Sequence, residues 1–239
     1  GNPEYGLAKS FKQISPNTEF FSRETGWDFG NNLQRKRLAD HLDAHGFNVF
    51  INSSALNNFN QCLLLEQIWD RWKLTERSKQ IICIGSTIDR VAKGSDWIYG
   101  TEKHALKQMC NGLSLLGVWS EIQCKVTYIS FGSLSTPKVT KKHPDRRLMD
   151  VNKAATYIKW VLDQPKDISL NELSIDPDFD DNIVEVTRLQ HANIHWGYWC
   201  KDLSALLEVC SPPQYVIDMI PLGDKRDIPA AQILAEGEI

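Results

Sequence analysis

The chain has 239 residues, enough to bury a full hydrophobic core in one α/β domain. Hydrophobic residues make up 42% and charged residues 24%, which is ordinary for a soluble globular protein and excludes a disordered chain. The net charge of −3 gives no electrostatic basis for nucleic-acid binding, and no apolar run approaches the roughly 20 residues of a membrane span, so we expect neither nucleic acid nor membrane as a partner.

Apolar runs of strand length alternate with segments of helical period, which is the pattern of βαβ units in a parallel sheet. In chain order the sequence predicts helix 7–13, strand 18–22, helix 33–45, strand 47–52, helix 60–72, strand 79–86, helix 97–116, strand 124–130, helix 149–162 and strand 167–175. Two of these strands are continuously apolar, as strands covered on both faces are. We therefore expect an α/β fold with three layers and a doubly wound, Rossmann-type parallel sheet.

The composition changes after Ile175, where the acidic, proline-containing stretch DPDFDDN follows. We expect a nucleotide-binding and catalytic domain at residues 1–175 and a C-terminal appendage at residues 176–239, which acts as a lid or an interface. Within the appendage, His191, His195 and Cys200 could ligate zinc if an acidic residue joined them. Because pairs of histidines at this spacing are more often incidental, we expect no metal site.

Three residues in the middle of the chain suggest acid-base chemistry. Ser86 ends an apolar strand, Tyr99 follows in the next helix, and Lys103 comes one helical turn later. A phenol has an ordinary pKa near 10, so its use near neutral pH needs a neighbouring cation, and residues i and i+4 share one helix face. Tyr5 and Lys9 have the same spacing, so the strand-ending serine is what distinguishes the second pair.

Ser86, Tyr99 and Lys103 resemble the Ser-Tyr-Lys triad of the short-chain dehydrogenase/reductase family. Three further segments resemble family motifs in the same order: GNPEYGLAK at residues 1–9 the glycine-rich phosphate turn, FINSSA the Asn-Asn-Ala-Gly strand end, and SFGSLSTP the later Pro-Gly…Thr segment. The resemblance implies that the tyrosine is the general acid or base, that the lysine lowers its pKa and holds the nicotinamide ribose, and that the serine orients the substrate carbonyl. For the helical asparagine of the family's proton relay, the nearest candidate is Asn60, with Gln61 beside it.

The same resemblance implies a dinucleotide site. Its candidate residues are Gly1, Asn2, Gly6, Ala8, Arg23, Asp28, Phe29, Asn52, Tyr99, Lys103, Gly132 and Thr136. The first glycine of the turn is matched by Asn2 or by Gly1 with one extra residue, and Ser53 and Phe131 also depart from the family pattern. The strand that precedes the turn in the family is absent, so we expect that native N-terminal residues are omitted here.

Arg23 directly follows a predicted strand, where an arginine can pair with a 2′-phosphate, so it favours NADP, with NAD possible. The alternative is an ordinary surface pair between Arg23 and Asp28.

The sequence therefore predicts an NADP-preferring oxidoreductase that interconverts a carbonyl and an alcohol, with a small molecule as its substrate. The alternative is an inactive scaffold of the same fold that serves as a structural or binding subunit. An epimerase-like enzyme with the same triad is less well supported, because the C-terminal part is short for a substrate domain. Helices 60–72 and 97–116 resemble those that form family dimers and tetramers, which implies a homo-oligomer. Six cysteines without a CxxC pattern, and no signal-like segment at the start, predict a cytoplasmic setting.

Overall fold

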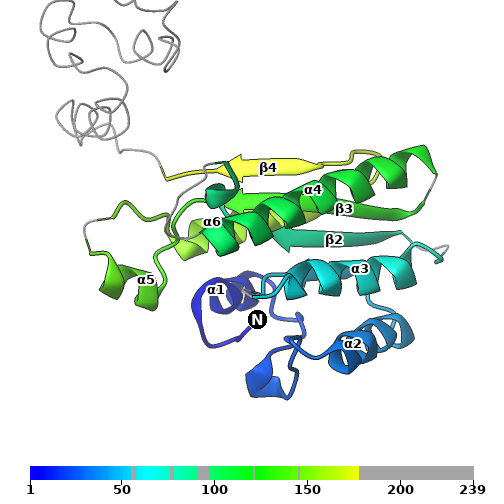
Figure 1. Ribbon diagram of the computed structural model, residues 1–239, viewed down its shortest axis with the longest axis horizontal. Helices are drawn as coiled ribbons and strands as arrows, with labels where there is room; N and C mark the ends of the chain where they lie inside the picture. Colours follow the sequence, from blue (N-terminus) through cyan, green and yellow to red (C-terminus); the bar gives the residue numbers. More distant parts are fainter. Residues whose placement is uncertain (55–56, 76–77, 91–96, 121, 145, 178–239) are drawn as a thin grey trace, which may run out of the picture. The chain divides into compact units, whose positions relative to one another are not determined.

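Four parallel strands form the sheet, in the order β1-β2-β3-β4. Figure 1 labels β2, β3 and β4. The computed structural model describes residues 1–54, 57–75, 78–90, 97–120, 122–144 and 146–177. The strands are β1 (Val49–Asn52), β2 (Lys79–Ile84), β3 (Cys124–Phe131) and β4 (Glu172–Ile175). The helices are α1 (Gly6–Ile14), α2 (Asn32–Ala44), α3 (Asn60–Trp72), α4 (Trp97–Trp119), α5 (Pro137–Lys142) and α6 (Val151–Leu162), with short 3₁₀ turns η1 (Arg23–Thr25) and η2 (Thr87–Arg90).

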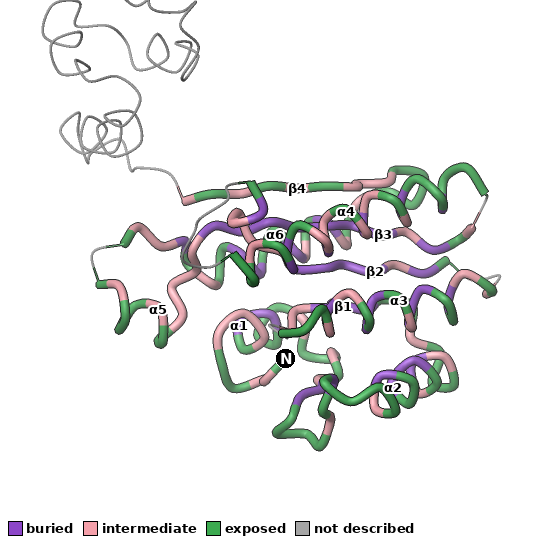
Figure 2. Tube along the Cα trace, in the orientation of Figure 1, coloured by how far each residue is buried: buried purple, intermediate pink, exposed green. Residues whose placement is uncertain are grey.

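Helices cover both faces of the sheet, as the apolar runs predict. Ile81 and Cys83 of β2 enter a core cluster with residues of α2, α3 and α4. Ile82 and Ile84 point the other way and pack with residues of α1 and α6. Because successive side chains of a strand alternate between faces, both faces of β2 are buried (Figure 2). The predicted three-layer α/β fold is confirmed.

The connection between β3 and β4 differs from the two connections before it. α3 and α4 join their strands over one face of the sheet, whereas α6 lies on the other face although the strand order continues in the same direction. This third crossover therefore has the opposite hand to the first two, and such mixed handedness is rare among parallel strands.

The strand predicted at residues 18–22 is wrong. This stretch has no β-ladder to any strand among the described residues, and β1 pairs only with β2. Its apolar side chains are still used, because Phe21 is buried in the core cluster with α2 and α3. The segment has the composition of a strand, but no strand in the described part of the chain lies against it to pair with its backbone groups.

The helices follow from their apolar stripes and caps. α3 has the predicted bounds, and its residues Leu64, Leu65, Ile68 and Trp72 form one buried stripe. α5 is not among the helices that the sequence predicts. Thr136 caps this short helix and Pro137 occupies its first position, both of which favour a helix start. None of the helices in the described part of the chain combines the length and apolar character needed to cross a bilayer.

Candidate active site

Ser86 lies just beyond the carboxyl end of β2, where η2 begins. Its hydroxyl accepts a 3.4 Å hydrogen bond from the backbone N–H of Ile88. Ile88 in turn packs beside Gly100 of α4, where an added Cβ would lie 3.7 Å from the Ile88 side chain. The turn that carries Ser86 thus contacts α4 next to Tyr99.

Tyr99 and Lys103 share one face of α4, as their spacing predicts. The Nζ atom of Lys103 lies 5.6 Å from the centroid of the Tyr99 ring. The tyrosine is 39% exposed, whereas the lysine is only 6% exposed. The phenol is therefore accessible to a ligand while the ammonium group lies beneath it.

Buried hydrogen bonds hold the ammonium group of Lys103. It donates to Oε1 of Gln61 at 2.6 Å and to the carbonyl oxygen of Ile84 at 3.2 Å. Burial lowers the pKa of Lys103 from its ordinary value of 10.5 to about 8, because the charged form loses solvation. The side chain is thus poised to change charge close to neutral pH.

This lowered pKa predicts how stability depends on pH. Between about pH 8 and pH 10.5 the unfolded chain binds more protons at Lys103 than the folded chain does. The contribution of Lys103 to the free energy of unfolding should therefore rise with pH by up to about 1.4 kcal/mol per unit in this window. Urea denaturation at a series of pH values measures this slope.

The control for this prediction is Lys103→Met, in which the Lys103 contribution to the slope should disappear. The raised thiol pKa values of Cys62 and Cys124, about 11 and about 12, lower stability as pH rises above 9, so the comparison is cleanest between about pH 8 and 9. An identical slope in both proteins would show that Lys103 is charged in the folded state throughout this range.

The amide that contacts Lys103 belongs to Gln61, not to Asn60. The Asn60 side chain accepts from Arg35 at 2.7 Å and donates to the carbonyl of Asn57 at 2.7 Å, so it faces α2. Gln61 lies at 4% exposure and donates to the backbone carbonyls of Asn52 and Ile84, both at 3.0 Å. The sequence held a signal for it, because Gln61 falls on the same helical stripe as the buried leucines of α3.

Asn52 also points into this network. Its side-chain amide donates to the backbone carbonyl of Gln61 at 3.0 Å, and Ser54 donates to its Oδ1 at 2.8 Å. Asn52 is 1% exposed. Its side chain therefore fixes the end of β1 against α3.

The turn at the amino end lies close to two of the other candidate segments. Gly6 has a φ of +53°, and an added Cβ would lie 3.3 Å from the Thr136 side chain. An added Cβ on Gly1 would lie 3.1 Å from both Ala8 and Ser53. Asn2 keeps a negative φ, and its Oδ1 accepts from the N–H of Glu4 at 2.9 Å. The left-handed position of this turn is therefore Gly6.

Arg23 and Asp28 form an ion pair on the surface, in which a guanidinium nitrogen of Arg23 lies 3.3 Å from Oδ1 of Asp28. Their side chains are 73% and 55% exposed. The next residue, Phe29, is buried in the core cluster, and its carbonyl accepts from Arg35 at 2.8 Å. An Arg23–Asp28 surface pair, which is the alternative weighed from the sequence, is thus present in the structure.

Gly132 packs against the residues that follow β4. Its N–H donates to the backbone carbonyl of Ile175 at 2.8 Å, and an added Cβ would lie 2.6 Å from Cδ of Pro177. The appendage predicted at residues 176–239 lies outside the described residues apart from its first two, and His191, His195 and Cys200 lie outside them as well. In the described part of the chain no group of histidine, cysteine and carboxylate side chains could hold a metal ion.

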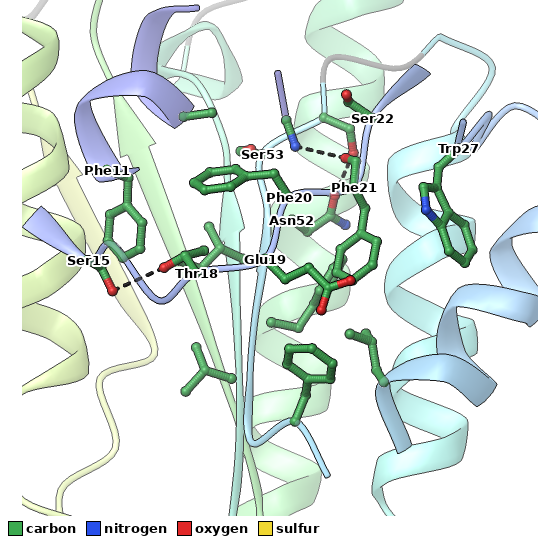
Figure 3. A pocket seen from close by; sticks show the side chains of 18 of the residues that line it. Phe11, Ser15, Thr18, Glu19, Phe20, Phe21, Ser22, Trp27, Asn52 and Ser53 are labelled. Carbon is green, nitrogen blue, oxygen red and sulfur yellow. Dashed lines mark hydrogen bonds between the residues drawn. The ribbon is translucent and has the colours of Figure 1, made fainter. Parts of the chain in front are cut away.

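A cavity of about 810 Å³ gathers half of the candidate cofactor residues (Figure 3). Its lining includes Gly1, Asn2, Ala8, Arg23, Phe29 and Asn52. The cavity follows the outer edge of β1, between that strand and residues 18–24, and is walled by the aromatic rings of Phe11, Phe20, Phe21 and Trp27.

Gly1 reaches the same cavity, and its backbone nitrogen donates to the carbonyl of Phe21 at 3.0 Å. Ser86, Tyr99 and Lys103 are not part of the lining. Two groups of candidate residues thus form, one around the cavity and one around Lys103, and Asn52 and Gln61 connect them by hydrogen bonds. The remaining candidates, Gly6, Asp28, Asn60, Gly132 and Thr136, are not part of the cavity lining.

The fold is that of short-chain dehydrogenases/reductases, as comparison with solved structures shows. A serine dehydrogenase complexed with NADP⁺ is 15% identical with a TM-score of 0.57, over 73% of this chain and 92% of that one. A short-chain dehydrogenase from Burkholderia cenocepacia J2315 in complex with NADP is 15% identical with a TM-score of 0.58, over 87% and 94% of the two chains. A 4-hydroxyisoleucine dehydrogenase complexed with NADH is 18% identical with a TM-score of 0.52, over 63% and 77%.

Comparison by sequence gave no relative. No protein-family model matches the chain, and no curated protein matches it. The resemblance inferred from the motifs is thus supported by the fold alone.

Proposed function

We propose that this chain is an NADP-preferring oxidoreductase that interconverts a carbonyl and an alcohol on a small molecule. The observation that carries the proposal is the buried ammonium group of Lys103, 5.6 Å from the Tyr99 ring centroid and beside the strand end that leads to Ser86. Neighbours of the same fold include complexes with NADP⁺ and with NADH.

Part of the cavity lining fits a dinucleotide, because six of the candidate cofactor residues lie there. Gly6 opens α1, so the amide groups and the positive end of this helix can attract a phosphate. When bound, the nicotinamide supplies or accepts the hydride, and the residues of the chain orient it and handle the proton.

Tyr99 is the group that moves the proton in this proposal. Below about pH 8 the charged Lys103 lowers the pKa of a nearby phenol, because a positive charge favours the phenolate. The negative phosphates of a dinucleotide would raise the pKa of Lys103 and keep it charged at higher pH. Ser86 would orient the substrate carbonyl, and we assign the amide that positions Lys103 to Gln61 in place of Asn60.

Arg23 supports the preference for NADP. Its guanidinium is exposed beside the cavity and only weakly engaged with Asp28 at 3.3 Å, so it can turn to a 2′-phosphate. Arg23→Ala should weaken NADPH binding about 10-fold, because a charged hydrogen bond is lost, and change NADH binding little. Titration of nicotinamide fluorescence measures both affinities.

Lys36→Ala is the matched control, since it removes one exposed cation from the neighbouring helix α2. It should leave the ratio of the NADPH and NADH affinities unchanged. If Arg23→Ala lowered the affinities for NADPH and NADH by the same factor, the assigned role of Arg23 would be contradicted.

The alternative remains a scaffold that has kept the fold without the activity. The features that favour it are the Arg23–Asp28 pair and the separation of the cavity lining from Tyr99 and Lys103. A ligand that binds the folded state raises the melting temperature. If neither NADPH nor NADH raises it, the scaffold is the better account.

We also propose that the chain forms a homo-oligomer through α4. The last turns of this helix expose large apolar side chains, among them Leu115, Val118 and Trp119, the last at 78%. Light scattering of the purified protein tests the oligomeric state. The cytoplasmic setting stays a prediction from the cysteine pattern.

A further inference from the structure

A buried tyrosine on β3 lies behind the candidate active site. Tyr128 is fully buried, and its hydroxyl donates to Oδ2 of Asp89 at 2.7 Å. The same hydroxyl also donates to the backbone carbonyl of Lys103 at 3.4 Å. One hydroxyl group therefore joins the turn η2 to helix α4, the two elements that carry Ser86 and the Tyr99–Lys103 pair.

The position of this hydroxyl depends on Gly85. An added Cβ at Gly85 would lie 2.0 Å from Oη of Tyr128 and 2.1 Å from its Cζ. The tyrosine thus fills the space that a side chain would occupy in the residue directly before Ser86. The phenol contacts the backbone of the candidate site without itself reaching the surface.

The carboxylate of Asp89 accepts its hydrogen bond from Tyr128 through Oδ2. Its other carboxylate oxygen, Oδ1, is buried and has no hydrogen-bond partner among the described residues. The backbone of Asp89 also contacts both parts of the candidate site. Its N–H donates to the backbone carbonyl of Ser86 at 3.1 Å, and its carbonyl oxygen lies 3.2 Å from Nδ1 of His104 on α4. Burial and the nearby Asp89 raise the pKa of Tyr128, so the phenol stays protonated and remains a donor.

We propose that Tyr128 is a positioning residue whose hydroxyl, held by Asp89, fixes the turn that carries Ser86 at a set distance from Tyr99 and Lys103. The proposal rests on the proposed function for its role in turnover, but its geometric content does not. Tyr128 acts through the backbone of Gly85 and Lys103 and through Asp89, and it touches no substrate.

Tyr128→Phe tests the geometric part, because it removes one oxygen and keeps the ring. We would label tyrosines with ¹³C at Cζ and assign the Tyr99 signal from its loss in Tyr99→Phe. In Tyr128→Phe the Tyr99 signal should shift or broaden, whereas Tyr157→Phe on α6 should leave it in place. An unmoved Tyr99 signal in folded Tyr128→Phe overturns the proposal, whether or not the protein turns over a substrate.

A second variant separates the hydrogen bond from the charge and also covers the case in which Tyr128→Phe does not fold. Asp89→Asn keeps an oxygen that accepts from Tyr128, so the Tyr99 signal should stay close to its wild-type position. The proposal is overturned if Asp89→Asn moves the Tyr99 signal as far as Tyr128→Phe does. It is also overturned if Asp89→Asn moves this signal far and Tyr128→Phe does not.

Kinetics then test the link to turnover. Tyr128→Phe should lower kcat about 10-fold or more in the wild-type background and leave NADPH binding unchanged. In a Ser86→Ala background the same substitution should have little further effect, because the turn no longer carries a group to position. Equal losses in both backgrounds would indicate a purely structural role. Absence of NADPH binding in the wild type would instead contradict the proposed function.

Discussion

Replacing Tyr99 with phenylalanine should lower kcat by about 100- to 10,000-fold, the range expected when a general acid or base is removed. NADPH binding should change little, because the ring that lies 5.6 Å from the Lys103 ammonium group remains in place. The loss would then fall on proton transfer alone. Steady-state rates and nicotinamide fluorescence, measured on the same preparation, separate the two effects.

Tyr157→Phe is the matched control for this prediction. It removes the same atom from an exposed tyrosine on α6, and it should leave both kcat and binding unchanged. Retained turnover in Tyr99→Phe would refute the role given to the phenol, and a parallel loss of NADPH affinity would move Tyr99 from proton transfer to binding.

Gly85→Ala should have the largest effect on stability. The new methyl group would lie 2.0 Å from Oη of Tyr128, and the ring of this tyrosine is fully buried. We expect a loss of at least about 3 kcal/mol in the free energy of unfolding, because overpacking forces both the strand end and the ring to move. Urea denaturation measures this loss directly.

Gly112→Ala provides the opposite case within the same fold. Gly112 lies inside α4, and an added Cβ would meet nothing within 4 Å. The substitution should stabilise the protein by about 0.5–1 kcal/mol, because alanine loses less backbone entropy in a helix. If Gly85→Ala is tolerated as well as Gly112→Ala, the close approach between Gly85 and Tyr128 is incorrect.

Much of the fold could be predicted from the sequence because hydrophobic period and strand length are local properties. The bounds of α3 agree with the prediction, and β2 and β3 lie within one or two residues of theirs. Residues 18–22 show where local reasoning fails. Their composition is that of a strand, but a strand also needs a partner backbone beside it, and the structure has a cavity there.

The candidate site could be predicted in part for the same reason. Residues i and i+4 of a helix share a face in any context, so the Tyr99–Lys103 face follows from spacing alone. The choice between Asn60 and Gln61 depends on how α3 is rotated against the sheet, which only the buried stripe of leucines indicates. The contact of Tyr128 with Gly85 joins a residue of β3 to the residue that follows β2, and no local pattern predicts it.

The pairing of one lysine with one phenol is tested most directly by titrating Tyr99 itself. With ¹³C at Cζ, the Tyr99 signal of the NADP⁺ complex reports the pKa of this single phenol. We predict a value clearly below the ordinary value of about 10 in the wild type, and a return towards about 10 in Lys103→Met. A phenol that titrates at the same pH in both proteins, or a chain that forms no complex with NADP⁺, would contradict it.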